Sequence, residues 1–332
     1  MTSIYSILRE GEIGIGLDSC LIPLKRHNLS LIQTTDCFYP LVDNPYVMGK
    51  ITCANVLSDL YAMGVVICDH LVILFSVCTQ MSEKERDVVI PLFVRGFREK
   101  AMEAGVEPSC QSVNENPWLL MGGVATTICN DKEYLTPLRA TNGDVLILTK
   151  PLGAEVMRRA YQNICQDDVI KDEILKVTSL ECVKDGFTHA MMSMERLNKT
   201  AALLMYKYDA HAATDVTGFG LLGHAENLAK EQTEQVEFVI DSLPYIEKSY
   251  DLAVTLKMKR YLEGYGAETS GGLLIAIPKH TATQFCTEIA EKEDWPAWII
   301  GSVVATTGER TARITDSPNI INAPIKQFEI TE

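Results

Sequence analysis

Four aspartates, each beside glycine, threonine or serine, constrain most strongly what this chain can fold into. They are Asp18 in Gly-Ile-Gly-Leu-Asp-Ser, Asp36 in Gln-Thr-Thr-Asp, Asp59 in Val-Leu-Ser-Asp and Asp215 in Ala-Thr-Asp-Val-Thr-Gly-Phe-Gly. Carboxylates beside small, turn-forming residues suit Mg²⁺ held against phosphate, because this hard cation takes oxygen ligands and keeps waters and substrate phosphates in its shell. The pattern therefore predicts an ATP-binding protein in which distant stretches of the chain meet.

The length and charge of the chain narrow its class. At 332 residues it exceeds a single core, which stops growing near roughly 250–300 residues, so we expect two domains. An apolar fraction of 47% is sufficient for two packed cores. The net charge of −14 argues against a nucleic-acid or anionic-membrane partner, since both are bound through basic patches.

The cysteines and the absence of long apolar runs indicate the compartment. The ten cysteines are dispersed, with no Cys-x-x-Cys pair and no Cys/His ligand spacing, which argues against a zinc site. Residues 1–10 contain no apolar core of a signal peptide, and no apolar run reaches the ~18–20 residues that span a bilayer. We therefore expect a cytoplasmic protein whose thiols are buried as small hydrophobic groups.

The first two aspartates are predicted at the ends of one β-hairpin. Apolar runs at 20–24 and 29–34 flank Lys25-Arg26-His27-Asn28, so that Asp18 lies at one end of the hairpin and Asp36 at the other. Asp36 is equally a candidate for a turn residue at a strand end, the commonest reason for an aspartate at such a place. Both interpretations of Asp36 stay open on the residues alone.

The third aspartate lies on a predicted helix from about 45 to 63. Asp43 is the expected N-cap, Pro45 suits the first turn and Gly64 stops the helix. One polar stripe interrupts its apolar sequence: Thr52, Asn55 and Asp59. An acidic residue late in a helix opposes the macrodipole, which favours a ligand role for Asp59 over a plain surface position.

The rest of the chain mixes further helices and strands, which predicts an α+β fold. Strands are expected at 70–78, 118–128, 144–149, 236–240, 273–278, 297–304 and 311–315, and helices at about 82–104, 183–208, 221–234 and 282–291. The domain boundary is placed near 130–145, where polar and glycine-containing segments interrupt the pattern.

Asp215 opens a glycine-containing loop in front of the helix expected at 221–234. The loop is either a simple helix entry or a turn that brings a carboxylate and backbone amides up to phosphate. His211 and His224 flank it without an acidic or cysteine partner at ligand spacing, so both are interpreted as structural. The segment Glu268 to Gly272 is interpreted as an architectural turn into a buried strand, and so is Gly122-Gly123. No Walker A motif occurs, so any ATP site is of another kind.

These segments, in this order, resemble the selenophosphate synthetases (selenide, water dikinases) of the aminoimidazole-ribonucleotide-synthetase-like, or PurM-like, superfamily. Within that family, their sequences look closest to those of the animal type-1 paralogues. The resemblance runs from about Gly14 to the C-terminus. Its most specific pieces are Gln33 to Asp36, Ala54 to Gly64, Asn116-Pro117-Trp118, Ala213 to Gly220 and Glu268 to Gly272.

The resemblance implies a two-domain fold, with residues 1–135 as a dimerisation and ATP/Mg²⁺ domain and 140–332 as a second α+β domain. It implies a homodimer whose N-terminal domains build a shared β-barrel. Three positions match metal ligands: Asp18, Asp59 and Asp215. Matches to nucleotide contacts are Gly16, Leu17, Asp18, Thr34, Thr35, Asp36, Asp59, Ser109, Cys110, Gln111 and Ser112. The family converts ATP, selenide and water to selenophosphate, AMP and phosphate.

Two departures from the family pattern bear on activity, and a third is milder. The family carries, upstream of the Asp18 match, a glycine-rich segment with Cys or selenocysteine and a nearby Lys, whereas residues 1–13 of this shortened N-terminus hold neither. Ser109-Cys110-Gln111-Ser112 stands where the family has Gly-Gly-Gln-Thr, and the added side chains should crowd the approach of nucleotide. Ala267 replaces a proline that stiffens a turn.

Three functions remain open on the sequence. The first is a degenerate selenophosphate synthetase-like protein that keeps the fold, the dimer and Mg²⁺–ATP binding while selenide chemistry is impaired. The second is an active ATP-dependent dikinase that uses selenide. The third is a non-enzymatic partner that forms a heterodimer with an active paralogue. No residue is assigned a catalytic role.

Overall fold

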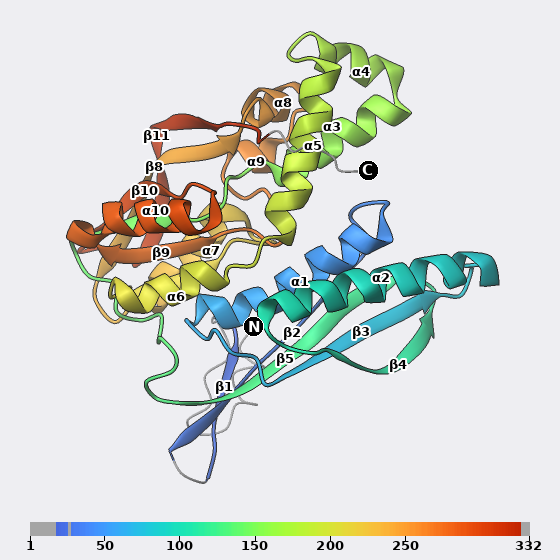
Figure 1. Cartoon of the computed structure of the whole chain (residues 1–332). Helices are drawn as coiled ribbons and strands as arrows, with labels where there is room; N and C mark the ends of the chain where they lie inside the picture. Colours follow the sequence, from blue (N-terminus) through green and yellow to red (C-terminus); the bar gives the residue numbers. More distant parts are fainter. Residues whose placement is uncertain (1–17, 26–27, 327–332) are drawn as a thin grey trace.

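The computed structural model describes residues 18–25 and 28–326 of the chain. These residues form two β-sheets with helices packed between and around them (Figure 1). The two sheets lie on either side of the boundary predicted near 130–145, and the exact domain limits stay a prediction. Among the described residues, no helix combines the length and the apolar character that crossing a membrane requires.

The first sheet has five strands in the order β1-β2-β5-β3-β4. They are β1 (Cys20–Pro23), β2 (Leu29–Phe38), β3 (His70–Cys78), β4 (Ser109–Asn116) and β5 (Leu120–Asn130). Neighbouring strands are antiparallel except β3 and β4, which are parallel. The predicted hairpin is confirmed as β1 and β2. Strand β4 was not expected, because its polar sequence lacks the alternation that predicts a strand.

Two helices cover one face of this sheet (Figure 1), α1 (Pro45–Ala62) and α2 (Glu83–Ala104). The N-cap of α1 is Asn44, whose side chain accepts from the backbone of Tyr46 and Val47, so the prediction of Asp43 was wrong by one residue. Asparagine is as good an N-cap as aspartate, and the sequence did not distinguish the two. Helix α2 opens with the predicted capping box of Ser82 and Glu85.

The second sheet has six strands in the order β11-β8-β10-β6-β9-β7. They are β6 (Asp144–Leu148), β7 (Ala212–Asp215), β8 (Val236–Ile246), β9 (Leu273–Pro278), β10 (Trp298–Ala305) and β11 (Thr311–Ala323). All neighbours are antiparallel except β8 and β11. The central strands β6 and β9 are almost wholly apolar and buried, as expected where helices cover both faces of a sheet.

Helices pack on this second sheet and beside it (Figure 1). They are α3 (Ala154–Gln166), α4 (Asp168–Leu175), α5 (Leu180–Glu195), α6 (Lys199–Lys207), α7 (Gly220–Glu231), α8 (Ser249–Thr255), α9 (Lys259–Leu262) and α10 (Lys279–Glu293). Helix α10 contacts α6, β6, β9 and β10, whereas α7 contacts β7, β8 and β11.

The prediction of a single helix over 183–208 is wrong. The structure breaks it into α5 and α6, separated by Arg196, Leu197 and Asn198. Arg196 adopts an extended conformation, with φ −70° and ψ 129°, which ends α5. The sequence has neither glycine nor proline there, so no local signal marked the break. The residues at this break contact parts of the chain that are distant in sequence, as described below.

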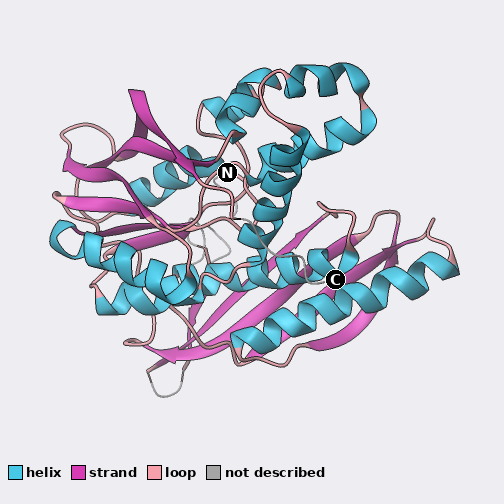
Figure 2. Cartoon of the chain, turned by 45° about the horizontal axis from the view of Figure 1, so that its top comes forward, coloured by secondary structure: helices cyan, strands magenta, loops and turns pink. Residues whose placement is uncertain are grey.

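Helix α1 joins the two halves of the molecule. It packs on β2, β5 and α2 of the first half and on α5, α6 and β7 of the second. Figure 2 shows helices lying between the two sheets. Because α1 has neighbours on both sides, most of its length is buried, including the polar residues Thr52, Asn55 and Ser58. Its polar stripe therefore faces the junction of the two halves instead of solvent.

The thiols are less uniformly buried than expected. Cys53 and Cys129 are buried, whereas Cys37, Cys110 and Cys165 are exposed. No disulfide joins cysteines within the described part of the chain. The prediction that the thiols act as buried hydrophobic groups is thus correct for some positions and wrong for these three.

Candidate metal centre

Asp18, Asp59 and Asp215 come together at the junction of the two halves. One carboxylate oxygen of each lies within 4.8 Å of those of the other two. Asp18 lies two residues before the start of β1, Asp59 lies late in α1, and Asp215 is the last residue of β7. Three acidic side chains from distant stretches therefore share one small volume, as the sequence pattern required.

Hydroxyl groups hold two of these carboxylates in place. The Thr214 hydroxyl donates to Asp18 Oδ1 at 2.8 Å, and the Thr34 hydroxyl donates to Asp59 Oδ2. Thr34 lies on β2 and Thr214 on β7, so strands of both sheets orient the cluster. Each threonine stands close to one aspartate in the sequence. In the structure it donates its hydrogen bond to an aspartate of another segment.

The electrostatics of the cluster disfavour three negative charges. Burial, and then the neighbouring carboxylate of Asp215, raise the pKa of Asp18 well above its usual range. Burial, Asp215 and Asp18 likewise raise the pKa of Asp59. Burial raises the pKa of Asp215 to about 6, and a hydrogen bond from Ser58 acts in the opposite direction. A divalent cation among these oxygens removes the repulsion, so the donor set fits Mg²⁺.

Asp36 lies beside the cluster and is not a turn residue. It sits within β2, and its side chain faces α1, where Asn55 Nδ2 donates to Asp36 Oδ2. The Asn55 Oδ1 atom in turn accepts the backbone N–H of Ser270 from the second half at 3.0 Å. The turn interpretation of Asp36 is therefore wrong, and its carboxylate is tied through Asn55 to both halves of the molecule.

Lys150 is a buried cation near these carboxylates. Its Nζ donates to the backbone carbonyls of Arg196 and Ser270, both at 2.7 Å. Burial, and then the Arg196 charge, lower the pKa of Lys150 well below its usual range, while Glu293 and Asp215 act in the opposite direction. Lys150 was not predicted from the sequence, because a lone lysine after a strand carries no spacing signal.

Several predicted nucleotide contacts lie away from the cluster or outside the described residues. Gly16 and Leu17 belong to the latter. Thr35 is exposed, on the sheet face opposite α1, since neighbouring strand residues point to opposite faces. Asp36, Gly123, Ile73 and Cys110 pair in one row across β2, β5, β3 and β4. Three strand spacings, roughly 14 Å, therefore separate Cys110 from Asp36 within one chain.

The altered segment Ser109 to Ser112 lies at the start of β4, at the edge of the first sheet. Neither Ser109 nor Cys110 has a positive φ, so both fit ordinary strand geometry. The Ser109 hydroxyl lies 3.3 Å from His70 Nε2. The side chain of Cys110 is exposed at this edge.

The glycine pairs are architectural, as predicted. A Cβ on Gly271 would collide with the carbonyl oxygen of Val216, and one on Gly122 would collide with that of Asp36. Only glycine lets these backbones approach so closely. The segments that carry Asp36 and Asp215 are therefore packed tightly against their neighbours.

His224 and Glu268 support the loop after Asp215 and the start of α3. The Nε2 atom of His224 accepts the backbone N–H of Thr217 at 3.0 Å, and burial lowers the pKa of His224 to about 4. Glu268 accepts the N–H of Gly153 at 2.7 Å, and burial raises the pKa of Glu268 to about 8. Both side chains are thus structural, which agrees with their interpretation from sequence.

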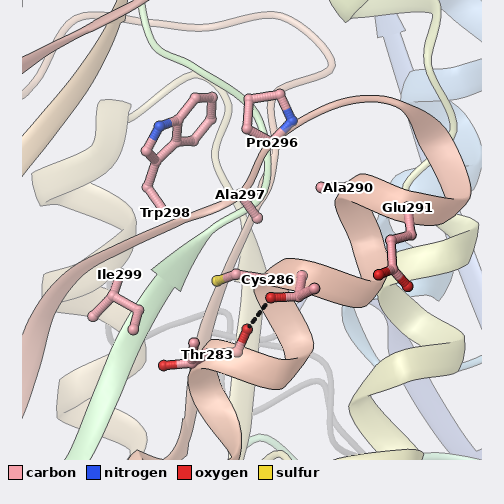
Figure 3. A pocket seen from close by; sticks show the side chains of 9 residues that line it. Thr283, Cys286, Ala290, Glu291, Pro296, Ala297, Trp298 and Ile299 are labelled. Atoms are coloured by element: carbon pink, nitrogen blue, oxygen red, sulfur yellow. Dashed lines mark hydrogen bonds between the residues drawn. The ribbon is translucent and has the colours of Figure 1, made fainter.

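The cavity between α10 and β10 is not part of this centre. It measures about 700 Å³, and Thr283, Cys286, Ala290, Glu291 and Trp298 are among its lining residues (Figure 3). Among the described residues that line it, Glu291 is the only carboxylate, and none of the four aspartates is among them. Its size alone gives no indication of the chemistry.

Comparisons with known proteins identify the family. Residues 16–116 match the N-terminal domain of AIR synthase related proteins, and residues 141–313 match the C-terminal domain. The chain is 50% identical to selenide, water dikinase 2 of Mus musculus over 314 residues, which cover 93% of this chain and 69% of the mouse protein. The chain belongs to the selenide, water dikinase family. Which numbered animal paralogue it resembles most stays a prediction.

Solved structures of other proteins share the fold of this chain. The thiamine-monophosphate kinase of Stenotrophomonas maltophilia superposes with a TM-score of 0.67 at 22% identity, covering 95% of this chain and 94% of that one. Hydrogenase maturation protein HypE in complex with ATP superposes with a TM-score of 0.62 at 16% identity, covering 83% and 77%. The predicted two-domain, PurM-like α+β fold is confirmed.

Proposed function

We propose that this chain is a selenophosphate synthetase-like protein that binds Mg²⁺ and ATP at the junction of its two domains and is impaired in selenide-dependent turnover. The observation that carries the proposal is the convergence of Asp18, Asp59 and Asp215 within 4.8 Å. Buried like charges this close are tolerated when a divalent cation or a proton compensates them.

The chain's own residues suit a nucleotide phosphate site. Asp18, Asp59 and Asp215 would hold Mg²⁺, which supplies charge neutralisation at phosphoryl oxygens when it is bound. Thr34 and Thr214 orient the carboxylates, and the acidic surface elsewhere leaves the binding of phosphate to metal and backbone amides. The ATP complex of the structural neighbour HypE supports ATP as the ligand of this fold.

The substitution at the start of β4 supports impairment. Two glycines at 109 and 110 would let a ligand approach the backbone of this edge strand closely, whereas the side chains of Ser109 and Cys110 crowd that approach. We propose that nucleotide binds more weakly for this reason. The start of β4 lies too far from Asp36 to reach the metal centre of its own chain. If two copies assemble, this edge is able to contribute to the nucleotide site of the other copy.

Calorimetric titration of ATP in the presence and absence of Mg²⁺ tests the binding proposal. We expect Mg²⁺-dependent binding that Asp59→Asn abolishes, because the amide loses the charge that attracts the cation. The control is Asp87→Asn, an exposed aspartate on α2, which should bind as the wild type does. Binding of ATP that is independent of Mg²⁺, or unchanged by Asp59→Asn, would contradict the proposal.

Release of AMP from Mg²⁺–ATP with and without selenide tests the impairment. We expect little selenide-dependent AMP from the wild type, and tighter ATP binding by the double variant Ser109→Gly, Cys110→Gly. Sustained, selenide-dependent AMP release by the wild type would instead establish an active dikinase and refute the impairment.

We also propose that the chain forms a homodimer through the open face of the first sheet. No helix of the described residues covers this face, where Leu74 and Ile128 are 37% and 50% exposed. Sedimentation of the wild type should show a dimer that the double variant Leu74→Lys, Ile128→Lys disrupts. Val88→Lys, on an exposed apolar residue of α2, is the control. A monomeric wild type that dimerises only with a paralogue would favour the heterodimer instead.

A further inference from the structure

Asn198 uses its side chain in an unusual way for a residue at a helix start. It is the N-cap of α6, yet its side chain makes no capping hydrogen bond. The side chain is 3% exposed, and Nδ2 donates to Ser58 Oγ at 3.0 Å and to the carbonyl oxygen of Gly271 at 2.9 Å. Asparagine is a favoured N-cap because its side chain normally satisfies the first backbone amides. Here the side chain of Asn198 instead bonds residues of other segments.

Both acceptors lie directly beside Asp215. Ser58 is fully buried on α1, and its hydrogen bond to Asp215 opposes the effect of burial on the pKa of that carboxyl. Gly271 packs so closely on Val216 that a Cβ would collide with the Val216 carbonyl oxygen. One amide group of Asn198 therefore holds the N-terminal domain at Ser58 and the C-terminal domain at Gly271, which contact Asp215 and the next residue, Val216.

The donor and acceptor roles in this arrangement are fixed. The NH₂ group of an asparagine side chain only donates, so Ser58 Oγ must accept from Asn198. The single hydroxyl hydrogen of Ser58 is then available to the carboxylate of Asp215, which only accepts when it is ionised. Asn198 thus orients the Ser58 hydroxyl toward Asp215 from a distance.

We infer that Asn198 is a positioning residue of the metal centre, which acts through Ser58 and Gly271 to place Asp215 against Asp18 and Asp59. Asn198 lies at the break between α5 and α6, and a continuous helix would place its side chain elsewhere. The inference rests on the proposed function, in that the three aspartates bind Mg²⁺. It assigns Asn198 no contact with substrate.

Calorimetric titration with Mg²⁺ alone tests this role without any turnover. We expect Asn198→Ala to weaken Mg²⁺ binding about 10- to 100-fold, the range for loss of a group that orients a metal ligand. Asn198→Asp has nearly the same shape but no NH₂ donor, and its carboxylate would attract the Ser58 hydrogen away from Asp215. We therefore expect Asn198→Asp to bind Mg²⁺ more weakly than Asn198→Ala.

A matched control separates positioning from general stability. Gln232 is also a fully buried amide that bonds backbone groups, at Ala140, Pro137 and Leu228, but its hydrogen bonds reach none of the three aspartates. Gln232→Ala should lower stability toward urea and leave Mg²⁺ affinity within about twofold of the wild type, since additive effects are expected at distant sites.

Ser58→Ala provides an independent variant if Asn198→Ala does not fold. It should weaken Mg²⁺ binding as well, and the two changes combined should cost less than the product of their separate effects, because they break one relay. Hydrogen exchange of the Ser270 amide, which bonds Asn55 across the junction, should accelerate in Asn198→Ala without metal.

The outcomes distinguish the two proposals. A wild type that does not bind Mg²⁺ would refute the proposed function. A wild type that binds Mg²⁺, together with Asn198→Ala, Asn198→Asp and Ser58→Ala that bind it equally well, would refute the positioning role alone. Equal losses of affinity in Asn198→Ala and Gln232→Ala would also refute it, because the effect would then be one of stability.

Discussion

Replacing Asp215 by asparagine should stabilise the metal-free protein while it abolishes Mg²⁺ binding. Asp215 is 3% exposed, and burial raises its pKa from the ordinary 3.8 to about 6. One pKa unit corresponds to about 1.4 kcal/mol, so ionised Asp215 destabilises the folded, metal-free protein by about 3 kcal/mol above pH 6. The neutral amide of Asp215→Asn removes this cost and can still accept from Ser58.

The sign of the pH dependence follows from the raised pKa. The folded state holds the Asp215 proton more tightly than the unfolded state, so this group stabilises the fold fully below pH 3.8. That contribution is lost as the pH rises through about 6. The gain from Asp215→Asn should therefore be largest near pH 8 and shrink as the pH falls toward 4.

Urea denaturation at pH 8 in EDTA and in saturating Mg²⁺ measures both effects. In EDTA, we expect Asp215→Asn to be up to about 3 kcal/mol more stable than the wild type. Mg²⁺ at 100 times its dissociation constant should stabilise the wild type by about 2.7 kcal/mol and leave the variant unchanged. A variant less stable than the wild type in EDTA, or one that Mg²⁺ stabilises equally, would refute the reasoning.

Two further predictions concern the loop after Asp215. Gly271→Ala should destabilise the protein by about 1–3 kcal/mol and weaken Mg²⁺ binding, because its Cβ would displace Val216, whereas Gly218→Ala should be neutral, having open space around it; urea denaturation and metal titration of both check this. His224 should remain neutral down to about pH 4, since it accepts from Thr217, and the stability it contributes should be lost as the pH falls from 6.5 toward 4; an NMR titration showing protonation near pH 6.5 would contradict this.

The candidate site was predictable where its residues have recognisable neighbours in the sequence. Asp18, Asp59 and Asp215 stand beside small or hydroxyl residues, and the structure brings all three together, although their role as ligands stays a prediction. Asn55 was noticed as part of a polar stripe. Ser58 was noted only as the neighbour of Asp59, and Lys150 was not selected, because a buried serine or lysine leaves no periodic signal in the sequence.

The sequence by itself determined the family, the α+β class and the acidic residues of the centre, because short motifs and apolar periodicity are local properties of the chain. Only the tertiary structure decided that α5 ends at Glu195, that Asn44 caps α1 and that Asn198 reaches Ser58. Asp43 and Asn44 are near-equal as caps, and neither the end of α5 nor the partner of Asn198 has a signal in the neighbouring sequence. The free energies of such alternatives become distinct only when another element packs against them.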